Sequence, residues 1–346
     1  MSTPGTPDIA VVGYAARIHP EGTAASEAGL VHTAVTEALA RSGLSRTDIG
    51  FTVSGSLDYL SGTPFSFVGA LDAIGAWPPI SESHVEMDAA WALYEAWLRL
   101  RHGDIGTALV YGFGKATQGS LPEVLARQLD PYHLAPLGVD AVSLAALQAR
   151  AVLDAGRTDE AGLAAIAARS GRPGPGGHED PPPLPLLPGH TARPADGAAA
   201  VVLAAGETAR RLAAGHGTVP VWIRGLDQRI DGHSPAGRDL ARCPSAERAA
   251  AGAGLAGAPV DLAELHVRHP HEEVLLRDAL GLGPEVPVNP SGGPLAADPV
   301  MATGLIRIGE AARRIADGTA RRAAAHAAQG PCLQHNLVAV LEGGAR

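Results

Sequence analysis

The chain has 346 residues and a formal net charge of −9 at neutral pH. This length is ample for a buried core in one large domain or two smaller ones. The acidic excess argues against a surface for nucleic acids or anionic membranes, and no apolar run reaches the roughly 18 residues of a membrane helix. The two cysteines, Cys243 and Cys332, fit neither a disulfide framework nor a zinc-binding spacing, so a cytoplasmic location is expected.

Hydrophobic patterning predicts alternating strands and helices in the first half of the chain. Buried strands are expected over 8–14, 49–53, 107–111 and 198–204, and helices over 26–42 and 88–102. The first helix has one apolar stripe and is followed by Gly43, a typical C-capping residue. The second ends before Gly103 and is apolar on nearly all sides, which predicts a buried, central position.

The same order recurs in the second half. Strands are expected over 219–226, 261–267 and 332–341, and helices over 245–254, 272–280 and after Pro299. In the last helix, apolar residues recur at helical spacing: Met301, Leu305, Ile308, Ala312 and Ile315. Two such series predict an α/β protein with halves 1–215 and 216–346, each with a mixed, mostly parallel sheet covered by helices.

A segment rich in proline and glycine, 171–197, precedes the last strand of the first half. Its composition excludes a helix or a central strand. One interpretation is a flexible surface loop. The other is a lid over a ligand pocket, because long structureless loops in compact domains are often functional. The sequence leaves both interpretations open.

Four segments resemble, in the same order, motifs of the thiolase superfamily. The segment 85–115 is similar to the nucleophile segment, in which a buried helix precedes a strand that ends in glycine. The segment 196–204 resembles the last strand of the thiolase N-terminal half. The segments 261–282 and 332–343 resemble the His-Asp-Cys-Phe segment and the Gln-His-Asn-Leu strand of sterol-carrier-protein-type thiolases.

A fifth match is the family's Asn-x-x-Gly-Gly turn, here Asn289, Gly292 and Gly293, which is expected to form or support an oxyanion site. The resemblance implies a thiolase-type five-layer fold with two similar halves. Within that superfamily, the chain resembles the actinobacterial lipid-transfer-protein group of thiolase-like proteins, which is linked to steroid degradation.

The chain departs from the family at the nucleophile. Thiolases place a cysteine thiolate at the start of the central helix, where the helix N-terminus lowers its pKa. Aligning the family's Cys-Ala-Ser-Gly with residues 86–89 puts Glu86 in the cysteine's place. A shift of two or three residues puts Asp88 or Ala89 there instead, and no register supplies a cysteine. For the two carboxylates, the alternative is a favourable charge at a helix N-terminus.

Three further residues are candidates for catalysis. Asp298 stands where the family carries the histidine of its Gly-His-Pro motif, and His266 matches the histidine of His-Asp-Cys-Phe. His335 or Asn336 takes the place of the second thiolase cysteine. Two of these have structural alternatives, because Asp298 before a proline is a good N-cap and His266 can be a satisfied core histidine.

The resemblance implies a protein of lipid or steroid side-chain degradation that acts on a coenzyme A thioester and has no permanently bound cofactor. Without a nucleophilic cysteine, the chemistry that remains is a retro-aldol cleavage of a C–C bond with Asp298, His266 or His335 as the base, and Glu86 and Asp88 as less favoured candidates. The alternative is a non-catalytic subunit of a thiolase complex. No metal is expected, because Pro270 interrupts the histidine-rich segment HVRHPH.

The resemblance also predicts protein partners. Because the superfamily dimerises through its N-terminal half, a homodimer or a heterodimer with a thiolase paralogue is expected. Relatives in this group associate with a small protein made of a zinc ribbon and an oligonucleotide-binding-type (OB-fold) barrel that binds the coenzyme A moiety. This sequence contains no Cys-x-x-Cys pair, so such a module would come from a separate chain.

Overall fold

The computed structural model describes residues 6–75, 81–170 and 181–344. The strands and helices of the first half are β1 (Ile9–His19), α1 (Glu27–Ser42), β2 (Phe51–Gly55), α2 (Asp58–Ser61), α3 (Val68–Ile74), β3 (Glu82–Val85), α4 (Ala89–His102), β4 (Thr107–Lys115), α5 (Leu121–Ala126), α6 (Ala141–Asp154), α7 (Glu160–Arg169), β5 (Asp196–Ala205) and α8 (Gly206–Gly215). Those of the second half are β6 (Val221–Ile230), α9 (Pro244–Gly252), β7 (Leu262–Glu264), α10 (Pro270–Ala279), α11 (Gly293–Ala296), α12 (Thr303–Ala316), β8 (Arg322–Gln329) and β9 (His335–Gly343).

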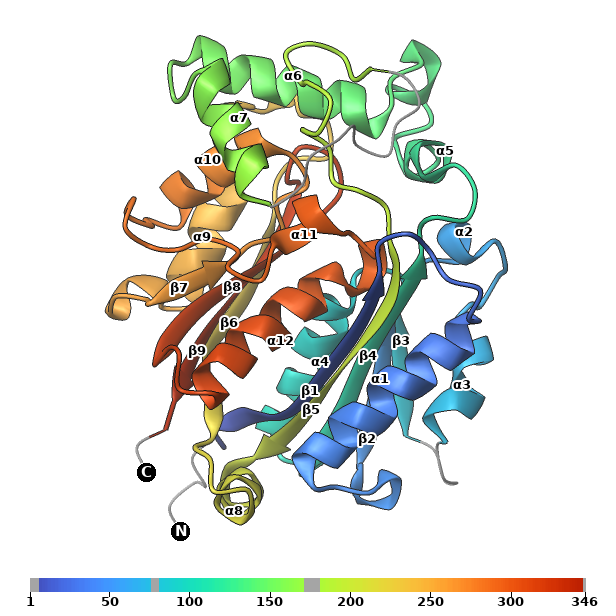
Figure 1. The fold of residues 1–346 in the computed structure, drawn as a ribbon, viewed down its shortest axis with the longest axis vertical. Coiled ribbons are helices and arrows are strands. Elements are labelled where there is room, and N and C mark those ends of the chain that lie inside the picture. Colours follow the sequence, from blue (N-terminus) through green and yellow to red (C-terminus); the bar gives the residue numbers. More distant parts are fainter. Residues whose placement is uncertain (1–5, 76–80, 171–180, 345–346) are drawn as a thin grey trace.

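Within the described residues, the strands form one sheet in the order β3-β2-β4-β5-β1-β6-β9-β8-β7 (Figure 1). The first half supplies the strands from β3 to β1, and the second half those from β6 to β7. The two parts join where β1 pairs with β6, through Ala10 opposite Trp222 and Val11 opposite Val221. The order is mirrored about this joint, because β2-β4-β5-β1 is followed by β6-β9-β8-β7.

Helices α4 and α12 contact each other and form a central layer between the two parts of the sheet (Figure 1). The largest hydrophobic cluster joins both helices to the inner faces of both parts. Because side chains alternate along a strand, each strand serves two layers. In β5, Val201 faces the central helices, whereas Ala200 and Val202 face α1.

The outer faces of the sheet are covered by other helices. Helices α1 and α3 pack on the first part, and α9 and α10 pack on the second. The layers are therefore α1, the first part of the sheet, α4 with α12, the second part of the sheet, and α9. This arrangement confirms the expected five-layer α/β fold and the central position of the helix that begins after Asp88.

The sheet is mixed, as expected, but parallel pairing among the described strands is confined to β3-β2-β4 and β7-β8. The prediction of mostly parallel pairing fails for the last strand of each half. Strand β9 follows β8 after only the loop 330–334, and so short a connection returns the chain antiparallel. Strand β5 takes the equivalent place beside β4 and is also antiparallel to it.

Capping residues set the ends of the two best-predicted helices. The Ser26 hydroxyl accepts the N–H of Gly29 at 3.1 Å at the start of α1. Gly43 and Gly103 follow α1 and α4 with φ of 72° and 87°, a left-handed conformation that costs glycine little.

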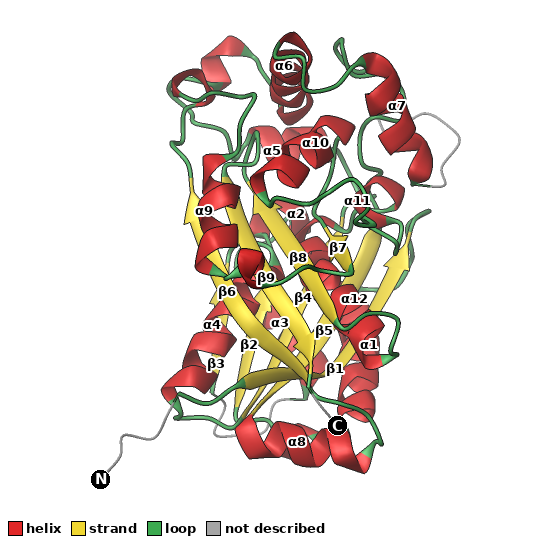
Figure 2. Ribbon diagram, turned by 90° about the vertical axis from the view of Figure 1, so that its left-hand side faces the viewer, coloured by secondary structure: helices red, strands yellow, loops and turns green. Residues whose placement is uncertain are grey.

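Helices α5, α6 and α7 lie together beyond one end of the sheet (Figure 2), and the segment 181–195 leads from this end into β5 (Figure 1). Of the segment 171–197, residues 171–180 lie outside the described residues, and Asp196 and Gly197 already belong to β5. The lid and surface-loop interpretations of this segment therefore both stay predictions. None of the described helices is long and apolar enough to cross a membrane.

Candidate active site

A cavity of about 320 Å³ lies where the start of α4 meets the loop between β8 and β9. Both halves line it. Glu86 and Met87 come from the segment before α4, and His335 from the first position of β9. His266 and Arg268, from the loop between β7 and α10, and Glu272, from the first turn of α10, form another wall. The other lining residues are Leu125, Gln128, Leu129, Ala141, Val300, Met301, Ala328, Gln329, Gly330, Pro331, Leu333 and Gln334.

His266 is buried, and its Nδ1 atom accepts the backbone N–H of Ala328 at 3.3 Å. A ring nitrogen that accepts a hydrogen bond carries no proton, so the neutral ring holds its proton on Nε2. Burial lowers the pKa of His266 to about 3, although the nearby Asp298 carboxylate acts in the opposite direction. At neutral pH, His266 is therefore an uncharged hydrogen-bond donor on the cavity wall and a weak base.

Asp298 lies behind the cavity wall rather than on it. Its Oδ2 accepts Nε of Arg268 at 2.7 Å, and its Oδ1 accepts the Thr303 hydroxyl at 2.6 Å and the Val300 N–H at 3.0 Å. Burial would raise the pKa of Asp298, but Arg268, His266 and these hydrogen bonds outweigh it and hold the pKa below its ordinary value. The carboxylate is therefore ionised and accepts an N–H of the short turn over 300–302 that precedes α12. It is not the N-cap of α12, which is Ala302. The carboxylate also fixes Arg268, which does line the cavity.

Two other predicted residues lie on the cavity wall. His335 is half-buried, and burial lowers the pKa of its ring. It packs edge-on against Trp91 with 6.3 Å between the ring centroids. Glu86 is partly exposed and is held by two contacts, because one carboxylate oxygen accepts the N–H of Asp58 at 2.6 Å and the other lies 3.2 Å from Nε2 of His84. Glu86 thus also anchors the start of α2.

Asp88 and Ala89 stand at the start of α4 but do not line the cavity. The Asp88 carboxylate accepts the N–H of Ala90 at 2.8 Å and the N–H of Gly304, in the first turn of α12, at 2.7 Å. One buried side chain therefore caps both central helices. Ala89 is fully buried, and a Cβ atom on Gly112 would lie 2.4 Å from its methyl group.

The predicted turn supports the site from behind. Asn289 has a positive φ of 51°, and its side-chain oxygen accepts the N–H of Leu265, the residue before His266, at 2.7 Å. Gly292 and Gly293 follow with φ of 99° and 66°, and a Cβ atom on Gly293 would lie 2.6 Å from the Asn289 amide nitrogen. None of the three lines the cavity. The turn fixes the backbone that carries His266.

The two cysteines lie outside the cavity lining. Both are buried, and burial raises the pKa of Cys243 to about 11 and that of Cys332 to about 12, so both are neutral thiols. Cys332 was predicted on the last strand, but β9 begins three residues later, at His335. Cys332 instead stands in the preceding loop with a φ of 53°, and its thiol points to the carbonyl of Leu144.

The sequence did not single out two charged residues of the cavity, Arg268 and Glu272. Arg268 is fixed by Asp298. Glu272 is buried in the first turn of α10, and its Oε2 accepts the N–H of Arg268 at 2.6 Å and that of His269 at 3.2 Å. The signal that marks Glu272 is a capping pattern, a carboxylate three residues after His269 with Pro270 between them.

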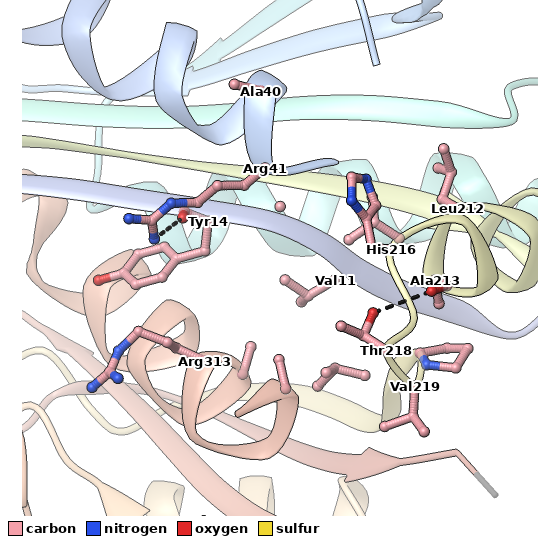
Figure 3. A pocket seen from close by; sticks show the side chains of 16 residues that line it. Val11, Tyr14, Ala40, Arg41, Leu212, Ala213, His216, Thr218, Val219 and Arg313 are labelled. Carbon is pink, nitrogen blue, oxygen red and sulfur yellow. Dashed lines mark hydrogen bonds between the residues drawn. The ribbon is translucent and has the colours of Figure 1, made fainter. Parts of the chain in front are cut away.

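Figure 3 shows a second cavity, of about 420 Å³, between β1, the end of α1, the end of α8 and α12. Its floor is apolar, with Val11, Leu212 and Val219 among its side chains. Arg41 and Arg313 at its edge already pair with Glu37 at 2.5 Å and Glu310 at 2.9 Å. None of the predicted site residues lines it, so we place the candidate site in the smaller cavity, where acids, bases and a cation converge.

Comparison with known proteins defines the fold. No protein-family model matches the sequence, and no curated protein matches it. A solved structure described as "Ltp2-ChsH2(DUF35) aldolase" superimposes with a TM-score of 0.75 and 18% sequence identity, over 97% of this chain and 98% of that chain. The mirrored order of strands, the central pair of helices and this similarity together establish that the chain has a thiolase-like α/β fold.

Proposed function

We propose that this protein cleaves a C–C bond of a β-hydroxyacyl-CoA thioester by a retro-aldol reaction. The observation that carries the proposal is the cavity itself. It lies at the start of the central helix and is lined by His266, Arg268, Glu272 and His335, while no cysteine lines it. A retro-aldol cleavage needs a base for the hydroxyl and donors for an enolate oxygen, but no covalent nucleophile.

The donors follow from the geometry described above. The Nε2–H of His266 is the donor that the ring offers to the cavity, and Arg268 adds a positive charge beside it. Both are held in place, His266 by Ala328 and Arg268 by Asp298. Donors that need no reorientation during the reaction stabilise developing negative charge most effectively. We therefore assign the thioester oxygen of the substrate to this side of the cavity.

The similarity to a structure named as an aldolase supports the reaction class. That name also joins two components, which supports a partner for this chain. We propose that the chain forms a thiolase-type dimer. We further propose that a zinc-ribbon/OB-fold chain is its coenzyme A-binding partner. Large apolar side chains stand exposed beyond the end of the sheet near the cavity, and a partner would cover them: Tyr132, Leu137, Leu147 and Leu184. They also favour the second candidate function, a non-catalytic subunit of such a complex.

The proposal is tested by incubating the full-length protein with β-hydroxy-β-methylbutyryl-CoA, alone and together with the proteins that co-purify from its host. Acetone and acetyl-CoA should appear in equal amounts. His266→Ala should lower the rate about 100-fold or more, because an oxyanion donor is lost. The control is His102→Ala, at the exposed end of α4, which should leave the rate unchanged. If neither preparation releases a ketone, the lyase activity is contradicted, and the second candidate function, a non-catalytic subunit, remains.

A further inference from the structure

Glu272 lines the candidate cavity and has one carboxylate oxygen without a hydrogen-bond partner among the described residues. Its side chain is 6% exposed and lines the cavity wall. Oε2 is held by the N–H groups of Arg268 and His269. Among the described residues, no donor reaches Oε1, so the free lone pairs of this oxygen are available to a molecule in the cavity.

Capping of α10 does not account for a carboxylate at this position. The capping pattern accepts glutamine as readily as glutamate, because a single side-chain oxygen receives the N–H groups. Burying an ionisable carboxyl group, in contrast, is costly unless the charge is matched. The Arg268 guanidinium nearby is already paired with Asp298 at 2.7 Å. The charge of Glu272 is favourable in the first turn of α10, but its second oxygen has no hydrogen-bond partner among the described residues.

The surroundings of Glu272 leave both of its protonation states accessible. Burial raises the pKa of Glu272 to about 7, while the N–H groups of Arg268 and His269 and the charge of Arg268 act in the opposite direction, and Asp298 adds to the rise. A group that must first accept and later return a proton works best with a pKa near the operating pH. The titratable and charged groups around it are His266, Arg268, His269, His271 and Asp298, and Glu86 and His335 also line the cavity.

We propose that Glu272 is the acid–base residue of the lyase reaction, an inference that rests on the proposed function. The Glu272 carboxylate takes the proton of the β-hydroxyl. The Cα–Cβ bond then breaks, the β-carbon becomes a ketone, and the bonding pair passes to Cα and the thioester oxygen as an enolate. Glu272 returns the proton to Cα, which yields a shortened acyl-CoA and regenerates the carboxylate. Atoms and charge balance without any co-reactant.

The three main bases predicted from the sequence serve this step less well. Asp298 lies behind the wall, with three donors on its carboxylate. His266 is neutral, and the nitrogen that would accept a proton is occupied by the N–H of Ala328. His335 lines the cavity, but it is only half-buried and burial lowers the pKa of its ring, which makes it a weaker base.

The test compares Glu272→Gln with Glu273→Gln in the full-length protein. Glu273 is the matched control, because it is equally buried on the next position of α10 and pairs instead with Arg169 and Arg277. Two reactions are followed, the cleavage of β-hydroxy-β-methylbutyryl-CoA and the exchange of the α-protons of acetyl-CoA with D₂O. The exchange reaction needs the base and the oxyanion donors but no C–C cleavage, so it tests Glu272 separately from the lyase.

We expect Glu272→Gln to slow both reactions by about 100-fold or more and Glu273→Gln to change neither by more than about three-fold per folded molecule. The wild-type cleavage rate should rise with pH and level off above about 7, a measurement that is independent of any variant's folding. If the wild type exchanges the α-protons of acetyl-CoA but does not cleave β-hydroxy-β-methylbutyryl-CoA, the lyase activity is overturned, whereas the role of Glu272 as a base is retained. Three outcomes would overturn the role of Glu272. They are equal reaction rates for Glu272→Gln and wild type, a wild-type cleavage rate that does not depend on pH, and no exchange of the acetyl-CoA α-protons in the wild type.

Discussion

At the scale of single residues, Asp88 links the two central helices of the fold. Its two oxygens accept N–H groups from the first turns of two different helices, α4 and α12. Helix N-termini leave such N–H groups without partners, and α12 has no side-chain cap of its own. The start of the second central helix is therefore satisfied by a residue from the other half of the chain.

Replacing Asp88 by alanine should destabilise the protein by about 3 kcal/mol, because one cap is lost and a second buried N–H loses its acceptor. The control is Asp159→Ala, which removes an ordinary cap from the exposed helix α7 and should cost about 1 kcal/mol. Urea unfolding measures both values. Equal costs for the two substitutions would contradict the double-capping role.

The loss of stability caused by Asp88→Ala should also depend on pH. Burial raises the pKa of Asp88 from 3.8 to about 7, so the folded protein holds this proton more tightly than the unfolded chain does. The stabilisation from proton binding is greatest at low pH and is lost as the pH rises toward 7. The cost of Asp88→Ala should therefore be larger at about pH 5 than at about pH 8.

The residues of the cavity show where the sequence was informative. His266, His335 and Glu86 were predicted, and the fold brings all three to one cavity from positions far apart in the chain. Arg268 and Glu272 were missed because their roles depend on burial and on partners. Asp298 fixes Arg268, and only the packing of α10 shows that the second oxygen of Glu272 is free. No local pattern contains that information.

At the scale of elements, the two central helices approach each other closely at Gly304. A Cβ atom there would lie 2.5 Å from both the Ala327 methyl group and an Asp88 oxygen, and 3.0 Å from the Ala90 methyl group. Two of these neighbours belong to the start of α4 and one belongs to β8. Gly304 is therefore required by packing, although it lies inside a helix.

Gly304→Ala should destabilise the protein by about 1 to 3 kcal/mol as an overpacked core position. Helix propensity alone would favour the alanine by up to about 1 kcal/mol. The matched control is Gly69→Ala in α3, where nothing lies within 4 Å of a new Cβ atom, so the propensity gain should appear undiminished. Thermal unfolding of the two variants should give shifts of opposite sign, and shifts of the same sign would contradict the close approach.

Elements with strong local signals were predicted, and those without them were not. Helices α1 and α4 carry their caps in the sequence, and α12 carries its apolar periodicity. Strand β8 was missed because its sequence, RAAAHAAQ, is rich in alanine, a strong helix former. Pairing with β9 and β7 on both sides holds it extended, and tertiary contacts of this kind override local propensity.

At the scale of the whole molecule, the halves share a core. Helix α4 of the first half and α12 of the second belong to one hydrophobic cluster, together with the inner faces of both parts of the sheet. Neither half can bury its central helix without the other. The boundary between 1–215 and 216–346 thus separates two units of topology that depend on each other for stability.

Residues 1–215 and 216–346 expressed separately should each lack cooperative unfolding, because the inner face of each sheet would be exposed. Expressed together in one cell, the two fragments should associate and restore the circular dichroism and unfolding midpoint of a folded complex. Calorimetry of the fragments checks this expectation. A cooperative transition in either fragment alone would show that its half folds independently.

The joint between the two parts of the sheet has a consequence for ligand binding. Only two residue pairs connect β1 to β6, so the two parts are held together mainly by the side chains of the central layer. The cavity takes Glu86 from the first half of the chain and His266, Glu272 and His335 from the second. A molecule bound between these residues would therefore link the two halves and raise the unfolding temperature of the whole protein.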